Sequence, residues 1–110
     1  MTRSQHLAPS SIRTGDLVVD CVAKTATVGG QPVHLGMKEY QLVECLSLHH
    51  DTVLTRAALL AHLYGTVAQP EIKIVDILLD KLRRKLAHAT ARIVETSHAG
   101  VMGFRLIGPP

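Results

Sequence analysis

Residues 71–89 carry the periodicity that most restricts how this chain can fold. Apolar side chains recur there at alternating spacings of three and four, which places them on one side of an α-helix of 3.6 residues per turn. They are Ile72, Val75, Leu79, Leu82 and Leu86. Pro70 immediately precedes the segment and suits the start of a helix, because its missing N–H would have no partner there. The pattern predicts a helix from Glu71 to about Ala89 that packs this side on a core.

The opposite side of this helix is basic. It collects Lys73, Ile74, Ile77, Lys81, Arg84, Lys85 and His88. Residues 70–92 hold six basic and three acidic residues while the rest of the chain is balanced, so the whole net charge of +3 lies here. Such a stripe is typical of polyanion binding, although a basic outer face is often simply solvated. Ile74 and Ile77 fit a solvated face poorly, which favours a contact surface.

Short strands precede this helix. Between Ile12 and Leu35 the apolar residues fall in short runs and alternations, and Gly29-Gly30 is a strong signal for a tight turn. This segment predicts an antiparallel sheet of three or four strands. Residues 1–11 show no periodicity and are interpreted as a flexible tail.

Two further helices and a hairpin complete the predicted order. Helices are expected at residues 37–49 and 56–63, with Thr55 as the N-cap of the second. The runs Ile93–Thr96 and Phe104–Ile107 flank a glycine-containing segment and predict a C-terminal β-hairpin. The sequence thus predicts one α+β domain of an antiparallel sheet, three helices and a hairpin.

Composition excludes several classes of protein. Hydrophobic residues make up 46% of the 110 residues, enough for one packed core. No apolar run approaches the roughly 18 residues of a membrane span, and the N-terminus lacks the apolar stretch of a secretory signal, so we expect a cytoplasmic, nucleoid-associated protein. No nucleophile–base or paired-carboxylate arrangement indicates an enzyme. The seven histidines are scattered without zinc-ligand spacing, so neither a metal nor another cofactor is expected.

Three segments of the chain resemble the helices of a known family. They are Leu35–Leu46 (LGMKEYQLVECL), Leu54–Leu60 (LTRAALL) and Lys73–Leu86 (KIVDILLDKLRRKL). Together they resemble the OmpR/PhoB-type effector domain of two-component response regulators, and the likeness assigns residues 12–108 to that domain. It implies a winged helix-turn-helix fold in which the C-terminal hairpin is the wing. It further implies a third helix that enters the DNA major groove and a wing that touches the neighbouring minor groove.

The resemblance also implies site residues. It implies DNA contacts from the third helix at Lys73, Ile77, Lys81, Arg83 and Arg84. We add Leu78 and Lys85 of the same helix and, where it is protonated, His98 of the wing to the predicted DNA-binding residues. The loop from Tyr64 to Pro70 corresponds to the family's loop for contacting RNA polymerase, and its first residues are Tyr64, Gly65 and Thr66. The domain is expected as a monomer in isolation or as a head-to-tail dimer on DNA.

Two departures from the family occur on the third helix. Leu78 and Asp80 stand where polar or basic residues are more usual, and Asp80 would either repel phosphate or accept a hydrogen bond from cytosine N4. Arg83 lies nearer the core side, and we expect it to be partly structural and paired with Asp76 or Asp80.

A third departure lies in the wing. The segment Ser97–Gly103 is interpreted as a longer loop that lacks the family's arginine. It offers an exposed pair, Val101-Met102, for a protein partner. No phosphoacceptor aspartate cluster is present, so the chain is either a fragment or a stand-alone regulator. Two hypotheses follow: a sequence-specific regulator that binds double-stranded DNA, or a winged-helix protein that acts through protein contacts.

Overall fold

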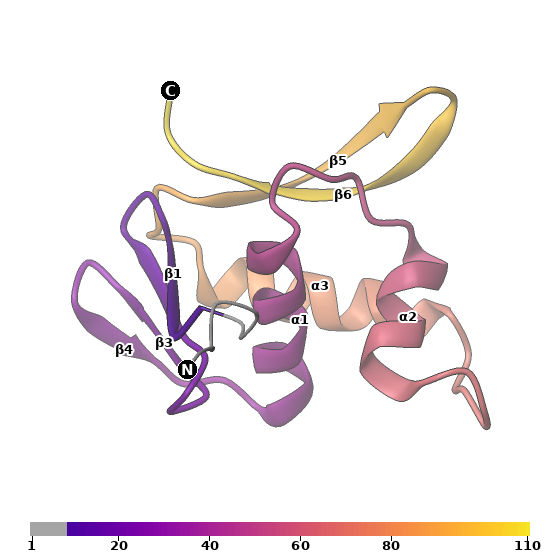
Figure 1. Cartoon of the computed structure of the whole chain (residues 1–110), viewed down its shortest axis with the longest axis horizontal. Helices are drawn as coiled ribbons and strands as arrows, with labels where there is room; N and C mark the ends of the chain where they lie inside the picture. Colours follow the sequence, from indigo (N-terminus) through magenta and orange to yellow (C-terminus); the bar gives the residue numbers. More distant parts are fainter. Residues whose placement is uncertain (1–8) are drawn as a thin grey trace, which may run out of the picture.

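The computed structural model describes residues 9–110, in which a four-stranded sheet is followed by three helices and a two-stranded hairpin (Figure 1). The elements are β1 (Ser11–Thr14), β2 (Leu17–Asp20), β3 (Thr25–Val28), β4 (Gln31–Val33), α1 (Met37–Leu48), α2 (Arg56–Tyr64), α3 (Lys73–Lys85), β5 (Arg92–His98) and β6 (Val101–Ile107). This confirms the predicted order. Of the tail expected over Met1–Ser11, residues 1–8 lie outside the described residues, and Ser11 already belongs to β1.

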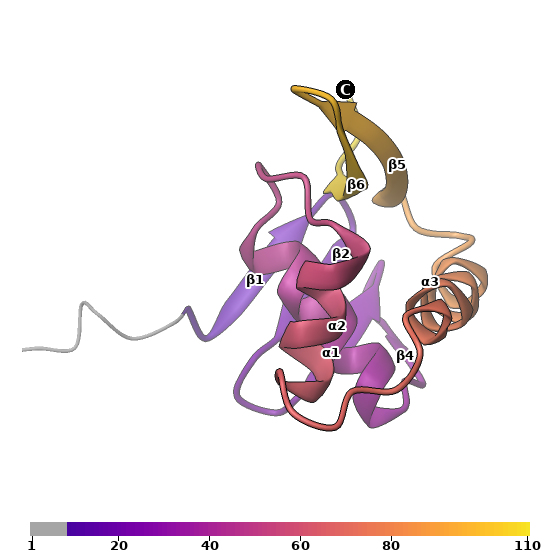
Figure 2. The same cartoon turned by 90° about the vertical axis from the view of Figure 1, so that its right-hand side faces the viewer.

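The N-terminal sheet is an antiparallel meander that packs on α1. Its strands follow in the order β1-β2-β3-β4, and alternate residues of β2, Leu17 and Val19, are fully buried. Gly29 and Gly30 both have positive φ, at 57° and 84°, which suits the two-residue turn between β3 and β4. The predicted turn is therefore confirmed, and the sheet packs beside α1 (Figures 1 and 2).

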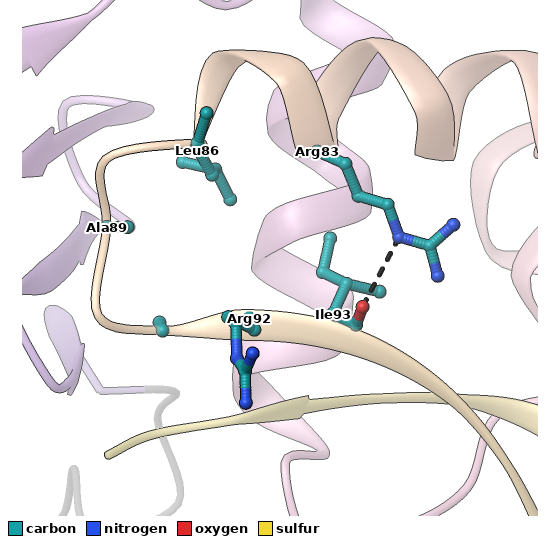
Figure 3. A pocket seen from close by; sticks show the side chains of 7 residues that line it. Arg83, Leu86, Ala89, Arg92 and Ile93 are labelled. Carbon is teal, nitrogen blue, oxygen red and sulfur yellow. Dashed lines mark hydrogen bonds between the residues drawn. The ribbon is translucent and has the colours of Figure 1, made fainter.

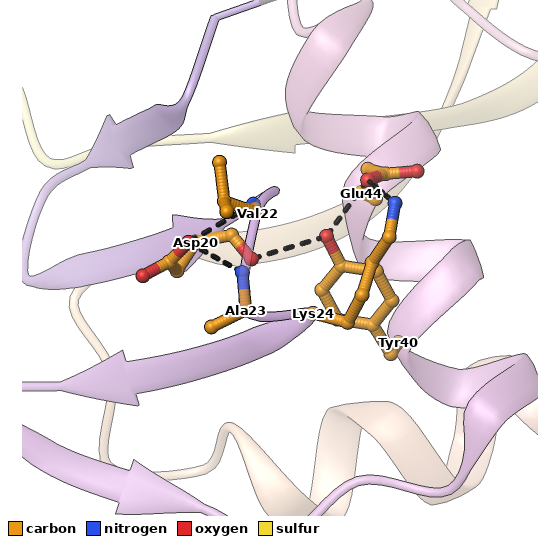
Figure 4. A network of polar contacts seen from close by, with 6 residues as sticks. All are labelled: Asp20, Val22, Ala23, Lys24, Tyr40 and Glu44. Atoms are coloured by element: carbon orange, nitrogen blue, oxygen red, sulfur yellow. Dashed lines mark hydrogen bonds and ion pairs between the residues drawn. The ribbon is translucent and has the colours of Figure 1, made fainter.

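A polar network fastens the β2–β3 turn to α1 (Figure 4). The Tyr40 hydroxyl donates a hydrogen bond to Glu44 Oε2 at 2.7 Å and lies 3.4 Å from the backbone oxygen of Asp20. Lys24 Nζ lies 3.6 Å from the same Glu44 oxygen. Burial of Tyr40, together with its hydrogen bond to the Glu44 carboxylate, raises the pKa of the phenol well above its ordinary value. Tyr40 therefore stays protonated and serves as a donor that links sheet and helix.

Helix α3 is shorter than predicted, and the side that it buries differs from the predicted side. It spans Lys73–Lys85 rather than residues 71–89. Ile72, expected in the core, precedes the helix and is 47% exposed, whereas Ile74, expected outside, packs against the core. The buried arc instead includes Leu78, which is only 8% exposed. Because Ile72 lies before the helix, it is not part of the side that packs on the core. That side is therefore centred closer to Leu78 than predicted.

The wing is a regular hairpin and not the long loop predicted over Ser97–Gly103. Ser97 pairs with Met102 and His98 pairs with Val101, so only Ala99 and Gly100 form the turn. Both turn residues have positive φ, at 53° and 81°, as two-residue hairpin turns require. The prediction was wrong because the glycines were taken as loop markers, whereas Gly100 closes the turn and Gly103 lies within β6.

Backbone pairing holds the wing against the segment between α1 and α2. Leu54 and Phe104 exchange two hydrogen bonds, with N···O distances of 2.9 Å and 2.8 Å. Gly103 permits this close approach. A Cβ atom at position 103 would lie 2.6 Å from the Leu54 carbonyl oxygen and 2.6 Å from Val53 Cγ1.

Glu39 in the first turn of α1 is a buried carboxylate that joins α1 to α3. Its Oε1 atom accepts hydrogen bonds from the Gly36 backbone N–H at 2.7 Å and from Lys85 Nζ at 2.6 Å. Burial by itself raises the pKa of Glu39. The hydrogen bonds from Lys85 and Gly36 and the charge of Lys85 outweigh burial, and they hold this pKa below its ordinary value of 4.5.

Replacing Gly103 by Ala should destabilise the fold by about 1–3 kcal/mol, because a backbone oxygen cannot yield to the new methyl group without distorting the Leu54–Phe104 pairing. Urea unfolding followed by circular dichroism measures the loss. Gly108→Ala is the matched control, since its Cβ would meet Thr14 Cγ2 at an ordinary 3.5 Å. Equal stabilities for the two variants would contradict the packing described for Gly103.

Replacing Glu39 by Gln should make the free energy of unfolding less dependent on pH. Because the folded-state pKa lies below the unfolded one, the charged carboxylate stabilises the fold at neutral pH, and this contribution is lost as the pH falls through the folded pKa. Glu39→Gln should be less stable than the parent by about 1–3 kcal/mol at neutral pH. The difference should shrink below pH 4.5. Urea titrations from neutral pH down to about pH 3 test this, and a constant difference would refute it.

Candidate nucleic-acid interface

The exposed side of α3 forms a continuous surface directed away from α1. In Figure 2, α3 is seen nearly end-on, and α1 lies between it and β1. Six of the exposed residues of α3 recur at helical spacing, and we call them the outer face: Lys73, Asp76, Ile77, Asp80, Lys81 and Arg84. Ile77 lies among these charges with 45% of its surface exposed. The outer face therefore combines long cations with one exposed β-branched apolar side chain.

Both carboxylates of the outer face are engaged by arginines. Arg84 Nη2 lies 2.6 Å from Asp80 Oδ2, and Arg56 Nε lies 2.9 Å from Asp76 Oδ1. Arg56 also reaches Glu95 Oε2 on β5, at 3.2 Å. These hydrogen bonds and charges, those of Asp76 foremost, raise the pKa of Arg56 above its ordinary value. Arg56 thus joins α2, α3 and the wing.

Arg83 does not pair with Asp76 or Asp80, so this part of the prediction was wrong. Its Nε instead donates to the backbone oxygen of Ile93 at 3.3 Å (Figure 3), and its guanidinium carbon lies 5.7 Å from the centre of the Phe104 ring. A cavity of about 210 Å³ opens beside it between the end of α3 and β5. Arg83 therefore has the expected structural role, with different partners.

Two residues of α3 that were predicted to contact DNA interact with other parts of the domain. Leu78 is buried in the core, and the ammonium group of Lys85 is bound to the buried Glu39. Neither side chain can leave these partners without cost, and their contact with DNA stays a prediction. Lys81, in contrast, makes no ion pair within residues 9–110, and the ammonium of Lys73 lies 3.5 Å from the equally exposed Glu71.

The end of the wing carries the remaining predicted residues. His98 is exposed beside the turn, and Val101 and Met102 are 50% and 52% exposed. Arg105 Nε donates to the backbone oxygen of His50 at 3.0 Å, so this side chain is tied to the segment between α1 and α2. The wing therefore presents one histidine and an apolar pair.

The loop after α2 begins with an anchored residue. The Tyr64 ring is half-buried, and Lys38 Nζ lies 4.4 Å from its centre. Gly65 ends α2 with a φ of 74°, and Thr66 and Val67 beyond it are exposed. The predicted partner loop is thus exposed from Gly65 to Pro70, and only its first residue, Tyr64, is anchored.

Sequence reasoning missed Arg56 and Glu95. Each looks like an ordinary surface charge on its own element, because the network that engages them joins three elements distant in sequence. No spacing within α2 or β5 signals it.

Comparisons with known proteins agree with this architecture. Residues 30–106 match the family model described as "Transcriptional regulatory protein, C terminal". The chain is 53% identical over 85 residues to the cell cycle transcriptional regulator CtrA of Caulobacter vibrioides, covering 77% of this chain and 37% of that protein. It is 55% identical over 84 residues to the cell cycle response regulator CtrA of Brucella ovis, covering 76% and 36%. The chain thus spans little more than a third of the length of these relatives.

A solved structure shows the same fold. The DNA-binding domain of Klebsiella pneumoniae RstA, determined in complex with the RstA box, superposes with a TM-score of 0.74 at 26% identity, covering 90% of this chain and 98% of that one. No helix within residues 9–110 is long and apolar enough to cross a bilayer. With its sheet, three helices and C-terminal wing, the chain belongs to the family of transcriptional regulatory protein C-terminal domains, of the OmpR/PhoB type.

Proposed function

We propose that this domain binds double-stranded DNA in a sequence-specific way, with the outer face of α3 in the major groove. The observation that carries the proposal is the outer face itself, where Lys73, Ile77, Lys81 and Arg84 project from the side opposite the core. The RstA domain that shares this fold was solved with its DNA box. Under this proposal the chain regulates transcription, as the name of its relative, the cell cycle transcriptional regulator CtrA, indicates for that protein.

The geometry fits the chemistry of the groove. The major groove admits one α-helix, and long cations can reach phosphates or the O6 and N7 atoms of guanine. Ile77 lies between the cations and can meet a thymine methyl group. The Arg56 network joins β5 to α2 and α3, so the wing and the third helix are linked on one side of the domain. His98 would then lie beside the neighbouring stretch of duplex.

Further parts of the proposal concern partners. We propose that the domain acts by binding alone, without catalysis, in the cytoplasm at the nucleoid, as a monomer or as a head-to-tail dimer on DNA. RNA polymerase is the proposed partner of the loop that begins with Tyr64, Gly65 and Thr66. The exposed Val101-Met102 pair supports a protein contact at the wing, since exposed apolar residues gathered at one tip suit such contacts.

Lys81→Ala should weaken binding to a preferred duplex by about 1–3 kcal/mol, because its ammonium group makes no ion pair within residues 9–110 and lies on the outer face. Fluorescence anisotropy with a labelled duplex measures the affinity, and circular dichroism checks the fold. Arg13→Ala is the matched control, since it removes the same charge from β1 on the other side of α1. If the two variants bind alike, α3 is not the recognition helix.

Met102→Asp should leave DNA affinity within about threefold of the parent, because a charge at a tip clear of the phosphates is screened by salt. The same variant should disrupt any protein complex that the domain forms through the wing tip, because the new charge would be buried in that contact. Val22→Asp, on the exposed turn between β2 and β3, controls for the added charge. A large loss of DNA affinity in Met102→Asp with the fold intact would show that the wing tip lies against DNA.

A further inference from the structure

Asp80 lies on the outer face of α3, where a carboxylate opposes the binding of a polyanion. Its side chain is paired with Arg84, and the two are 67% and 70% exposed. An exposed pair at this helical spacing adds little to stability. The contribution of this pair to fold stability therefore does not explain why a carboxylate occupies this surface.

The pair has a defined geometry. Arg84 Nη2 donates to Asp80 Oδ2 at 2.6 Å, and Arg84 Nε lies 3.5 Å from the Asp80 backbone oxygen. Asp80 thus takes the side of the guanidinium formed by Nε and Nη2. The far end, with Nη1 and the second hydrogen of Nη2, stays available, because arginine has five N–H donors in one plane.

Two parallel N–H groups at the end of a guanidinium match the O6 and N7 acceptors of guanine. Fixing the guanidinium before binding reduces the conformational entropy that the long side chain loses on contact. The other outer-face carboxylate cannot do this for Arg84, since Asp76 is bound to Arg56. Lys81 offers a compact ammonium, which lacks the planar fork.

We propose that Asp80 is a positioning residue that holds Arg84 for end-on, two-bond recognition of one guanine. The proposal rests on the DNA-binding function above. Asp80 contributes to specificity in two ways, because it orients the arginine and because its charge disfavours contacts with phosphate alone. Its place on a basic helix then has a functional reason.

The test compares sequence preference rather than affinity alone. A preferred duplex is selected from a random pool with the parent chain, and binding is measured to duplexes changed at each base pair. For the parent, one G·C pair should stand out, and its replacement should weaken binding about 5-fold or more. Asp80→Ala and Arg84→Lys should both remove that preference while leaving the other positions unchanged. Asp80→Glu should retain it, because the carboxylate can still reach Arg84.

Controls separate positioning from simple charge. Glu71 precedes the same helix, and its carboxylate pairs with Lys73 and not with an arginine. Glu71→Gln should therefore change the affinity for all duplexes alike. Combining Asp80→Ala with Arg84→Lys should cause no further loss at the G·C pair, since both act through one contact.

Three outcomes overturn the proposal. If Asp80→Ala tightens binding to every duplex equally, Asp80 only repels phosphate. If it removes a preference that Arg84→Lys keeps, Asp80 contacts a base directly. If the parent chain binds DNA without any sequence preference, or does not bind, the proposed function itself fails and this inference fails with it.

Discussion

The arrangement of the wing and the helices depends on the contacts of Phe104 with Leu54, Arg56 and Arg83. Its backbone exchanges two hydrogen bonds with Leu54, and its buried ring lies 4.8 Å and 5.7 Å from the guanidinium carbons of Arg56 and Arg83. Contacts between a cation and an aromatic face add about 0.5–2 kcal/mol each. Because the two arginines come from α2 and α3, this one aromatic residue ties both helices to the wing.

The same contacts shape the charge of the outer face. Arg56 neutralises Asp76, Arg84 neutralises Asp80 and Lys85 is drawn inward to Glu39. The surface therefore presents fewer independent charges than the composition of residues 70–92 suggests. Affinity for a polyanion then depends on a few cations, and sequence preference depends on how firmly each is oriented.

Much of the fold follows from local patterns. Thr55 caps α2 as predicted, with its hydroxyl accepting from the Ala58 N–H at 3.0 Å, and Gly29-Gly30 forms the predicted turn. These features depend on residues close in sequence, where capping and turn chemistry act directly. The basic side of α3 was predictable for the same reason, since Lys81 and Arg84 stand opposite the apolar stripe in any helix through these residues.

The sequence by itself determined the order of the elements, the amphipathic third helix and the excess of positive charge on it, because each is a property of residues that are neighbours along the chain. Tertiary structure decided which side chains remain available for contact. Packing against α1 turned Leu78 inward and bound Lys85 to Glu39, and pairing across the hairpin made residues 97–103 a tight wing. These outcomes depend on partners distant in sequence, whose burial and hydrogen bonding no local periodicity records.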